Sequence, residues 1–344
     1  MQQTQDRDLH NRSHASSQKC ANAIFLRVKR TLNLWKSGPP AEIFGNFTQR
    51  GLYCFPEDGA SQFPWITHRH TPRDCGRPNP LLNLGEALAT GPRHHEFRED
   101  HAEANIAIWK EALFAADILL LHSSPVYYGL GVPRGDGSAV VVVPGFLGTD
   151  AYLTQLHTWL GRIGYRPYFS GIGINAECPN LLIQHRLNAC IDKALAETQR
   201  KIHLVGHSLG GIIARSVAGQ RPNDVASVTT LASPFRGTVM HRTVLHAAEA
   251  VRKHILREHG ADVLPTCYTG RCTCNFLDSL RRDVPTSVLE TAIYTRNDGI
   301  VDWHYCLTGK PDTDFEVPGT HIGLSFNSSA YTIIANRLAA ASPH

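Results

Sequence analysis

Residues 202–213 read Ile-His-Leu-Val-Gly-His-Ser-Leu-Gly-Gly-Ile-Ile. The apolar run Ile202–Val205 predicts a buried β-strand, and the apolar residues after the glycines predict a helix. Ser208, flanked by Gly206 and Gly210, therefore occupies a tight turn from strand to helix. Such a turn lifts a hydroxyl above the edge of the sheet, where the helix N-terminus stabilises developing negative charge. The pattern predicts a nucleophilic serine, and an ordinary glycine-rich turn is the alternative.

Strand-like and helix-like segments alternate along the chain on both sides of this turn. Because their connections are short, we expect the α/β class, with a mainly parallel sheet covered by helices on both faces. The expected strands are 139–143, 165–169, 202–205, 225–231, 291–295 and 315–317, and the expected helices are 152–160, 181–198, the segment from Ser208 to about 221, and 331–340. The segment 237–286 is too long for a plain connection and is expected to be an insertion.

The first hundred residues differ in character from the rest. Residues 1–100 are rich in His, Arg, Pro and Asn and lack a sustained period, which predicts a polar, partly disordered N-terminal extension. A small accessory subdomain is the alternative. The ordered domain is expected over 101–344, beginning with an amphipathic helix from Glu103. The apolar stripe expected to pack on the core is Ile106, Trp109, Leu113, Ala116 and Leu120.

Composition restricts the class of protein. The 344 residues are 42% hydrophobic and 19% charged, enough apolar material for a large core, which argues against wholesale disorder or a coiled coil. The formal charge of +4 is scattered, so no nucleic-acid partner is expected. Met1 to His10 contain no apolar signal-like segment and no apolar run is long enough to cross a bilayer, so we expect a cytoplasmic protein.

A nucleophilic serine requires hydrogen-bond donors for the oxyanion that forms on its substrate. The segment Val143–Gly148 follows the first strong strand, and Gly145 would let the N–H of Phe146 face the site. The N–H of Leu209, directly after Ser208, is the expected second donor. A simple turn between strand and helix is the alternative interpretation of this segment.

The general base and its orienting acid are expected after the serine, in the order Ser, acid, His. His321 lies on a loop after the last expected strand, and Asp298 follows the fifth expected strand. These positions predict a base at His321 and an acid at Asp298, with Asp302 as the nearest alternative acid. A plain turn at Asp298-Gly299 and a surface histidine are the non-catalytic interpretations.

Four motifs together resemble the α/β-hydrolase superfamily and, within it, the bacterial lipase and esterase-like branch. They are Pro144-Gly145-Phe146, Gly206-His207-Ser208-Leu209-Gly210, Asp298-Gly299-Ile300-Val301 and Thr320-His321-Ile322-Gly323. The resemblance covers about Ala139 to the C-terminus and implies an α/β-hydrolase fold that cleaves esters through an acyl-enzyme. Ser208 would attack the ester carbonyl while His321 and Asp298 move the proton. Pro144 departs from the histidine that many lipases carry there, which concerns the subfamily rather than the reaction.

The resemblance also implies that the insertion 237–286 forms a lid or cap. Its apolar residues would line an acyl pocket or form the insertion's own core; they are Val244, Leu245, Val251, Ile255, Leu256 and Leu264. The implied substrate is a small-molecule or lipid ester, with transient contact with a lipid surface and no cofactor. A thioesterase, amidase or acyltransferase on the same triad and a non-catalytic binding module are the alternatives.

The insertion also carries Cys267, Cys272 and Cys274 after His254 and His259. The two histidines are five residues apart, which on a helix separates them by about 140° and disfavours a zinc site. Nine cysteines in a chain without a visible signal segment favour reduced thiols. We expect free thiols here, with a local disulfide and structural zinc as the alternatives.

Overall fold

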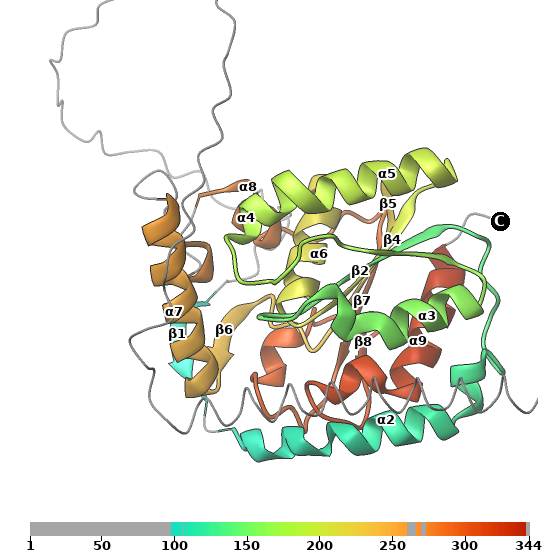
Figure 1. The fold of residues 1–344 in the computed structure, drawn as a ribbon, viewed down its shortest axis with the longest axis horizontal. Helices are drawn as coiled ribbons and strands as arrows, with labels where there is room; N and C mark the ends of the chain where they lie inside the picture. Colours follow the sequence, from blue (N-terminus) through green and yellow to red (C-terminus); the bar gives the residue numbers. More distant parts are fainter. Residues whose placement is uncertain (1–97, 105, 260–265, 270–272, 342–344) are drawn as a thin grey trace, which may run out of the picture. The chain divides into compact units, whose positions relative to one another are not determined.

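The computed structural model of the protein describes residues 98–104, 106–259, 266–269 and 273–341 (Figure 1). Within this part of the chain, a six-stranded sheet has the order β3-β2-β4-β5-β7-β8, and each neighbouring pair is parallel. The strands are β2 (Ala139–Val143), β3 (Arg166–Phe169), β4 (Ile202–His207), β5 (Val225–Leu231), β7 (Leu289–Tyr294) and β8 (Asp314–Glu316). The predicted parallel sheet and its six strands are confirmed.

Helices cover both faces of this sheet (Figure 1). One face carries α4 (Pro179–Leu182), the π-helical turn η4 (Ile183–Leu187), α5 (Asn188–Thr198), α6 (Leu209–Gln220) and α8 (Asn275–Leu280). The other face carries α2 (Phe114–Ser123), η2 (Pro125–Tyr128), η3 (Asp150–Leu153), α3 (Thr154–Arg162), η8 (Gly323–Phe326) and α9 (Ser328–Ala341). The predicted α/β class, with helices on both faces, is confirmed. None of the described helices is both long enough and apolar enough to cross a membrane.

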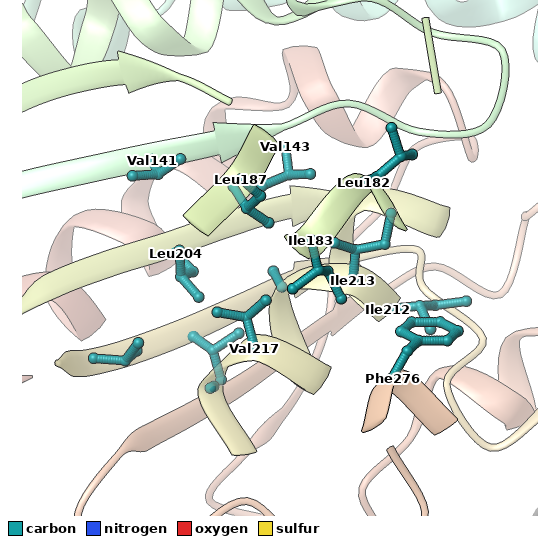
Figure 2. Close-up of a cluster of buried hydrophobic side chains, with 14 of the residues drawn as sticks. Val141, Val143, Leu182, Ile183, Leu187, Leu204, Ile212, Ile213, Val217 and Phe276 are labelled. Atoms are coloured by element: carbon teal, nitrogen blue, oxygen red, sulfur yellow. The ribbon is translucent and has the colours of Figure 1, made fainter. Parts of the chain in front are cut away.

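Side chains of the central strands alternate between the two faces, as the pleat requires. Val141 and Val143 of β2 point into the cluster under α5 and α6, whereas Val140 and Val142 point into the cluster under α3 and α9. Figure 2 shows Leu204 of β4 gathered with the first cluster. Because every residue of β2 is buried, the strand reads as a continuous apolar run, typical of a parallel sheet covered on both faces.

The helix expected from Glu103 differs from the prediction. Residues Ile108–Leu113 form a 3₁₀ segment, η1, and the α-helix α2 begins only at Phe114. Phe114, Ile118 and Leu121 pack on the core, whereas the predicted stripe faces outward, with Trp109 69% and Leu120 64% exposed. The tighter 3₁₀ turns change the phase of the residues before Phe114. Both stripes are apolar, so hydrophobic periodicity alone selected the wrong one.

A second, two-stranded sheet joins two distant segments of the chain. Strand β1 (Arg98–Glu103) pairs in parallel with β6 (Gly237–Met240), which opens the predicted insertion. Strand β1 crosses the boundary predicted at residue 100, and residues 1–97 of the expected extension lie outside the described residues. The insertion continues with α7 (Arg242–His259), η6 (Thr266–Thr269) and α8, and η7 (Trp303–Cys306) follows β7. Its role as a lid stays a prediction.

A buried ion pair connects α6 to β7. The Nε atom of Arg215 donates to Oε1 of Glu290 at 2.7 Å, and the two side chains are 3% and 9% exposed. The guanidinium also donates to the carbonyl of Leu280 and lies 4.6 Å from the ring centroid of Phe235. Because two charges have left water here, each stabilises the fold only while its partner remains.

We predict that Arg215→Ala lowers the free energy of unfolding by about 3–5 kcal/mol, because Glu290 would stay buried without its counter-charge. The matched control is Arg166→Ala, which removes an ion pair with Glu197 at the protein surface. That change should cost about 0–1 kcal/mol. Urea unfolding of both variants and the unchanged protein measures the difference, and equal losses would contradict the prediction.

Candidate active site

Ser208 lies between β4 and α6, where the sequence predicts a turn. Its backbone has φ 53° and ψ −125°, a left-handed conformation that side-chain-bearing residues rarely adopt. The Ser208 N–H donates to the carbonyl of Leu231 at 2.8 Å, and its carbonyl accepts from the N–H of Gly211 at 2.9 Å. The end of β5 and the first turn of α6 therefore hold the serine in this conformation.

The loop after β2 passes directly beside the serine. A Cβ atom on Gly145 would lie 3.1 Å from Cβ of Ser208 and 3.0 Å from Nδ1 of His207, tighter than most real contacts. Within the described residues, the N–H groups of Phe146 and Leu209 donate to no other protein group. Both predicted oxyanion donors thus belong to segments that flank Ser208, and both are available to a bound group.

Asn175 holds this loop in place. Its side-chain amide donates to the carbonyl of Pro144 at 2.8 Å, and its backbone N–H donates to the carbonyl of Gly148 at 2.9 Å. Its own carbonyl accepts from the N–H of Leu147 at 2.9 Å. Because Asn175 is fully buried, water does not compete for the three hydrogen bonds that fix the loop. No sequence motif marks this residue, because it lies in an irregular segment between β3 and α4.

His321 and Asp298 form a buried hydrogen-bonded pair. Nδ1 of His321 lies 2.8 Å from Oδ2 of Asp298, and the side chains are 3% and 1% exposed. The other carboxylate oxygen accepts from the N–H groups of Ile300 and Val301, each at 2.8 Å. Since the carboxylate only accepts, Nδ1 carries the proton in the neutral ring and Nε2 is left as the basic nitrogen.

The alternative acid, Asp302, has a different partner. Its Oδ1 accepts from the backbone N–H of His304 at 3.1 Å and lies 2.6 Å from Nδ1 of the same residue. It therefore begins the short helix η7 and orients an exposed histidine. Of the two carboxylates considered from the sequence, Asp298 is the one that contacts His321.

The environment of His321 favours its protonated form. Burial lowers the pKa of the imidazole, but the charge of Asp298, the hydrogen bond to Asp298 and the charge of Glu111 outweigh this effect. The pKa of His321 therefore lies above its ordinary value of 6.5. An imidazole that gains a proton readily is suited to act as a general base.

His207 links the serine turn to the His321 loop. Its Nε2 lies 2.9 Å from the carbonyl oxygen of His321, and the two ring centroids are 5.0 Å apart. Burial, together with the nearby charge of His321, lowers the pKa of His207 to about 3, so the neutral ring donates through Nε2. Among the described residues, no hydrogen bond joins the Ser208 hydroxyl to the His321 ring.

Glu111 contacts the same loops and was missed in the sequence. It is 6% exposed, and its carboxylate accepts hydrogen bonds from the N–H groups of Gly299, His321 and Ile322. The available signal was its phase: position 111 shares the three-to-four spacing of the residues at 114, 118 and 121, which pack on the core. A glutamate in register with an apolar stripe was the sign of a buried carboxylate.

An apolar pocket opens beside Ser208. Its lining consists of Phe146, Pro179, Ser208, Leu209, Ile212, Pro234, Met240, Val244, Ala248, Cys267, Tyr268, Phe276, Leu277, Leu280, Ile300 and Val301. Eight of these sixteen residues belong to the insertion 237–286, and none of the sixteen is charged. The pocket is therefore suited to an apolar group next to the serine hydroxyl.

Three of the six apolar insertion residues named from the sequence take one of the two expected roles. Val244 lines the pocket, whereas Val251 and Ile255 pack into the core cluster under α6. Leu256 is 43% exposed, and Leu264 lies outside the described residues. Leu245, which is half-buried, belongs to neither group. The insertion thus contributes both to its own packing and to the pocket wall.

The cysteines of the insertion lie near this pocket. Sγ of Cys267 is 3.8 Å from Sγ of Cys178 and 3.4 Å from Sγ of Cys274, and Cys178 and Cys267 are free thiols. Cys272 lies outside the described residues. No cluster of three or more His, Cys, Asp or Glu side chains suited to a metal ion occurs in the described ranges.

Comparison with known proteins agrees with this architecture. A family model for the alpha/beta hydrolase fold matches residues 140–252. A triacylglycerol lipase from Burkholderia plantarii is 34% identical over 128 residues, which are 35% of this chain and 36% of that lipase. A triacylglycerol lipase from Pseudarthrobacter phenanthrenivorans is 34% identical over 107 residues, 29% of this chain and 34% of that lipase. The chain thus matches about a third of the length of these curated relatives.

Two of the solved structures that the chain resembles are of lipolytic enzymes. One, from work on the metagenome-derived enzymes LipS and LipT, has 16% identity and a TM-score of 0.42, covering 62% of this chain and 96% of its own. A soluble variant of monoglyceride lipase from Saccharomyces cerevisiae has 15% identity and a TM-score of 0.41, covering 62% and 91%.

The parallel sheet, the serine turn after β4 and the family match define the class: the protein has the α/β-hydrolase fold. Within that fold it is similar, over about a third of its length, to bacterial triacylglycerol lipases. The resemblance stated from the four sequence motifs is confirmed at this level.

We predict that the two buried histidines titrate in opposite ways. His321 should titrate above pH 6.5, because Asp298 and Glu111 stabilise its charge, whereas His207 should stay neutral down to about pH 4. NMR titration of the imidazole resonances measures both, with His207→Gln and His321→Gln serving to assign them. A resonance that disappears in His207→Gln and titrates between pH 5 and 8 would contradict the neutral assignment.

Proposed function

We propose that the protein is a serine hydrolase that cleaves carboxylic esters. Ser208 is the nucleophile, His321 the general base and then the general acid, and Asp298 the carboxylate that orients His321. The observation that carries the proposal is the buried Asp298–His321 pair, whose ring packs against His207, the residue directly before the strained serine. This arrangement supports proton transfer between the imidazole and the hydroxyl.

The reaction proceeds in two halves. In the first, Oγ of Ser208 attacks the ester carbonyl while Nε2 of His321 takes its proton, and the N–H groups of Phe146 and Leu209 stabilise the oxyanion. The carbon–oxygen bond to the alcohol then breaks, and His321 donates the proton to the leaving oxygen. In the second half, water attacks the acyl-enzyme, loses a proton to His321 and releases the acid, restoring Ser208.

The acyl group of the substrate is apolar in this proposal. The pocket beside Ser208 presents side chains without charge, so a hydrocarbon chain gains by leaving water there. Half of the lining comes from the insertion 237–286, which supports its role as a lid over the bound acyl chain. The similarity to triacylglycerol lipases supports a lipid ester as substrate, reached by transient contact with a lipid surface.

Removing the triad residues tests the mechanism. Ser208→Ala and His321→Ala should each lower kcat for p-nitrophenyl ester hydrolysis by about 10⁴–10⁶-fold in a protein that still melts cooperatively. Asp298→Asn should cost less, because the ring remains with poorer orientation. Asp302→Asn is the control and should leave kcat unchanged, since Asp302 contacts His304. If Asp302→Asn were damaging and Asp298→Asn silent, the acid would be misassigned.

A labelling experiment distinguishes an enzyme from a non-catalytic binding module. A fluorophosphonate probe reacts only with an activated serine, so it should label the unchanged protein and not Ser208→Ala. An unlabelled protein that also leaves esters, thioesters and amides intact would contradict any hydrolase. If the protein cleaved a thioester or an amide faster than the matched oxygen ester, that compound class would be its substrate instead of carboxylic esters.

The pocket wall should set the length of the acyl chain. We predict that Val244→Trp moves the preference among p-nitrophenyl esters to chains shorter than those of the unchanged protein, because the indole would fill space beside Ser208. The matched control is Thr243→Trp on the adjacent, exposed position of α7. kcat/KM across esters of increasing length measures the effect. The same profile in both variants would place the acyl chain elsewhere.

A further inference from the structure

We propose that Glu111 is a positioning residue for the reaction: it fixes the Asp298 and His321 loops relative to each other and keeps a second negative charge beside the imidazole. This inference rests on the proposed function, because it assigns Glu111 a role through His321. Sequence motifs do not reveal it, since 188 and 210 residues separate Glu111 from Gly299 and His321.

The contacts of Glu111 join the two loops at their backbones. Oε1 accepts from the N–H of Gly299 at 2.8 Å and from the N–H of His321 at 3.0 Å. Oε2 accepts from the N–H of Ile322 at 2.8 Å. One carboxylate thus binds both Gly299, which follows the acid Asp298, and the base His321. Hydrogen bonds to an ionised acceptor are about twice as strong as neutral ones, so this anchor is rigid.

The Asp298-Gly299 motif fits this contact. A Cβ atom on Gly299 would lie 2.7 Å from Oε1 of Glu111 and 3.1 Å from the carbonyl oxygen of Ala107. A side chain at 299 would therefore push away the carboxylate or the backbone of the segment that carries it. The absence of a side chain at Gly299 therefore allows the Glu111 carboxylate to contact the loop that carries Asp298.

The negative charge of Glu111 has a consequence that a neutral anchor would lack. Within the described residues, Glu111 forms no salt bridge. A buried carboxylate is costly unless hydrogen bonds compensate for lost hydration, and here three backbone N–H groups do so. When Ser208 gives its proton to His321, an imidazolium forms that feels the charges of both Asp298 and Glu111. The second carboxylate stabilises that cation.

Several other groups surround the His321 loop. Asp298 and His207 contact His321 directly, and the hydroxyl of Tyr152 donates to the carbonyl of Ile322 at 3.1 Å. Asp117 on α2 faces Gly323, and burial together with the charge of Glu111 raises its pKa. Burial raises the pKa of Cys306 well above its ordinary value, with added effects from Asp298 and Asp302, so it is neutral. Besides Asp298, Glu111 is the carboxylate whose charge raises the pKa of His321.

The test compares Glu111→Gln and Glu111→Ala with Glu103→Gln, which changes an exposed carboxylate upstream of the same segment. We expect Glu111→Ala to lower kcat by about 100-fold with little change in KM, as for a small displacement of a catalytic group. Glu111→Gln keeps the shape and removes the charge. It should lower the pKa of His321 in NMR titration and shift the acidic limb of kcat/KM to lower pH, and Glu103→Gln should do neither.

The outcomes distinguish a positioning role of Glu111 from a purely structural one. If Glu111→Gln melts at a lower temperature but keeps the His321 pKa, the pH profile and kcat of the unchanged protein, Glu111 is a structural anchor and the proposal is overturned. The isosteric Gln variant keeps this comparison open if the Ala variant does not fold. An unchanged protein that neither hydrolyses esters nor reacts with fluorophosphonate would overturn the proposed function instead, which distinguishes the two failures.

Discussion

The strained backbone of Ser208 is the constraint on which the rest of the structure depends. A side-chain-bearing residue held at φ 53° costs about 1–3 kcal/mol and persists only where its surroundings enforce it. Here β5 accepts the serine N–H, α6 begins at the next residue, and the loop after β2 approaches within contact distance at Gly145. The two clusters that bury β2 and β4 on both faces keep these segments together. A hydroxyl on a looser turn would lack a fixed direction of attack.

The parallel sheet brings the remaining groups to the same edge. Val143 pairs with Gly206, His207 with Leu231, and Leu231 with Ile293, so β2, β4, β5 and β7 end close to one another. Three of these strands lead directly into segments of the site: β2 into the Phe146 loop, β4 into Ser208, and β7 into the loop of Asp298. Because the carboxyl ends of parallel strands share one edge, residues far apart in sequence come close together there.

Apolar periodicity and local motifs predicted the strands and the serine turn. They did not predict which of two apolar helix faces is buried, because tertiary packing decides that. The six strands and the serine turn follow from apolar runs and glycines, and the contact between His321 and Asp298 follows from strand order. The face of α2 was wrong because two apolar stripes compete and the 3₁₀ turns of η1 select the second. Glu111 and Asn175 were missed because each binds backbone groups of distant segments, and every residue type carries such groups.

The two buried histidines show how this packing assigns roles to similar residues. His207 has its Nε2 hydrogen engaged by the carbonyl of His321 and a pKa of about 3, so it remains a neutral donor that holds the loop. His321 has its Nδ1 hydrogen on Asp298, which leaves Nε2 free and the ring easily protonated. Both rings are deeply buried, so desolvation alone would make both poor bases. The nearby carboxylates separate them, because they face His321 and stabilise its cation. In the proposed mechanism, proton transfer would therefore depend on backbone-held carboxylates as much as on the imidazole itself.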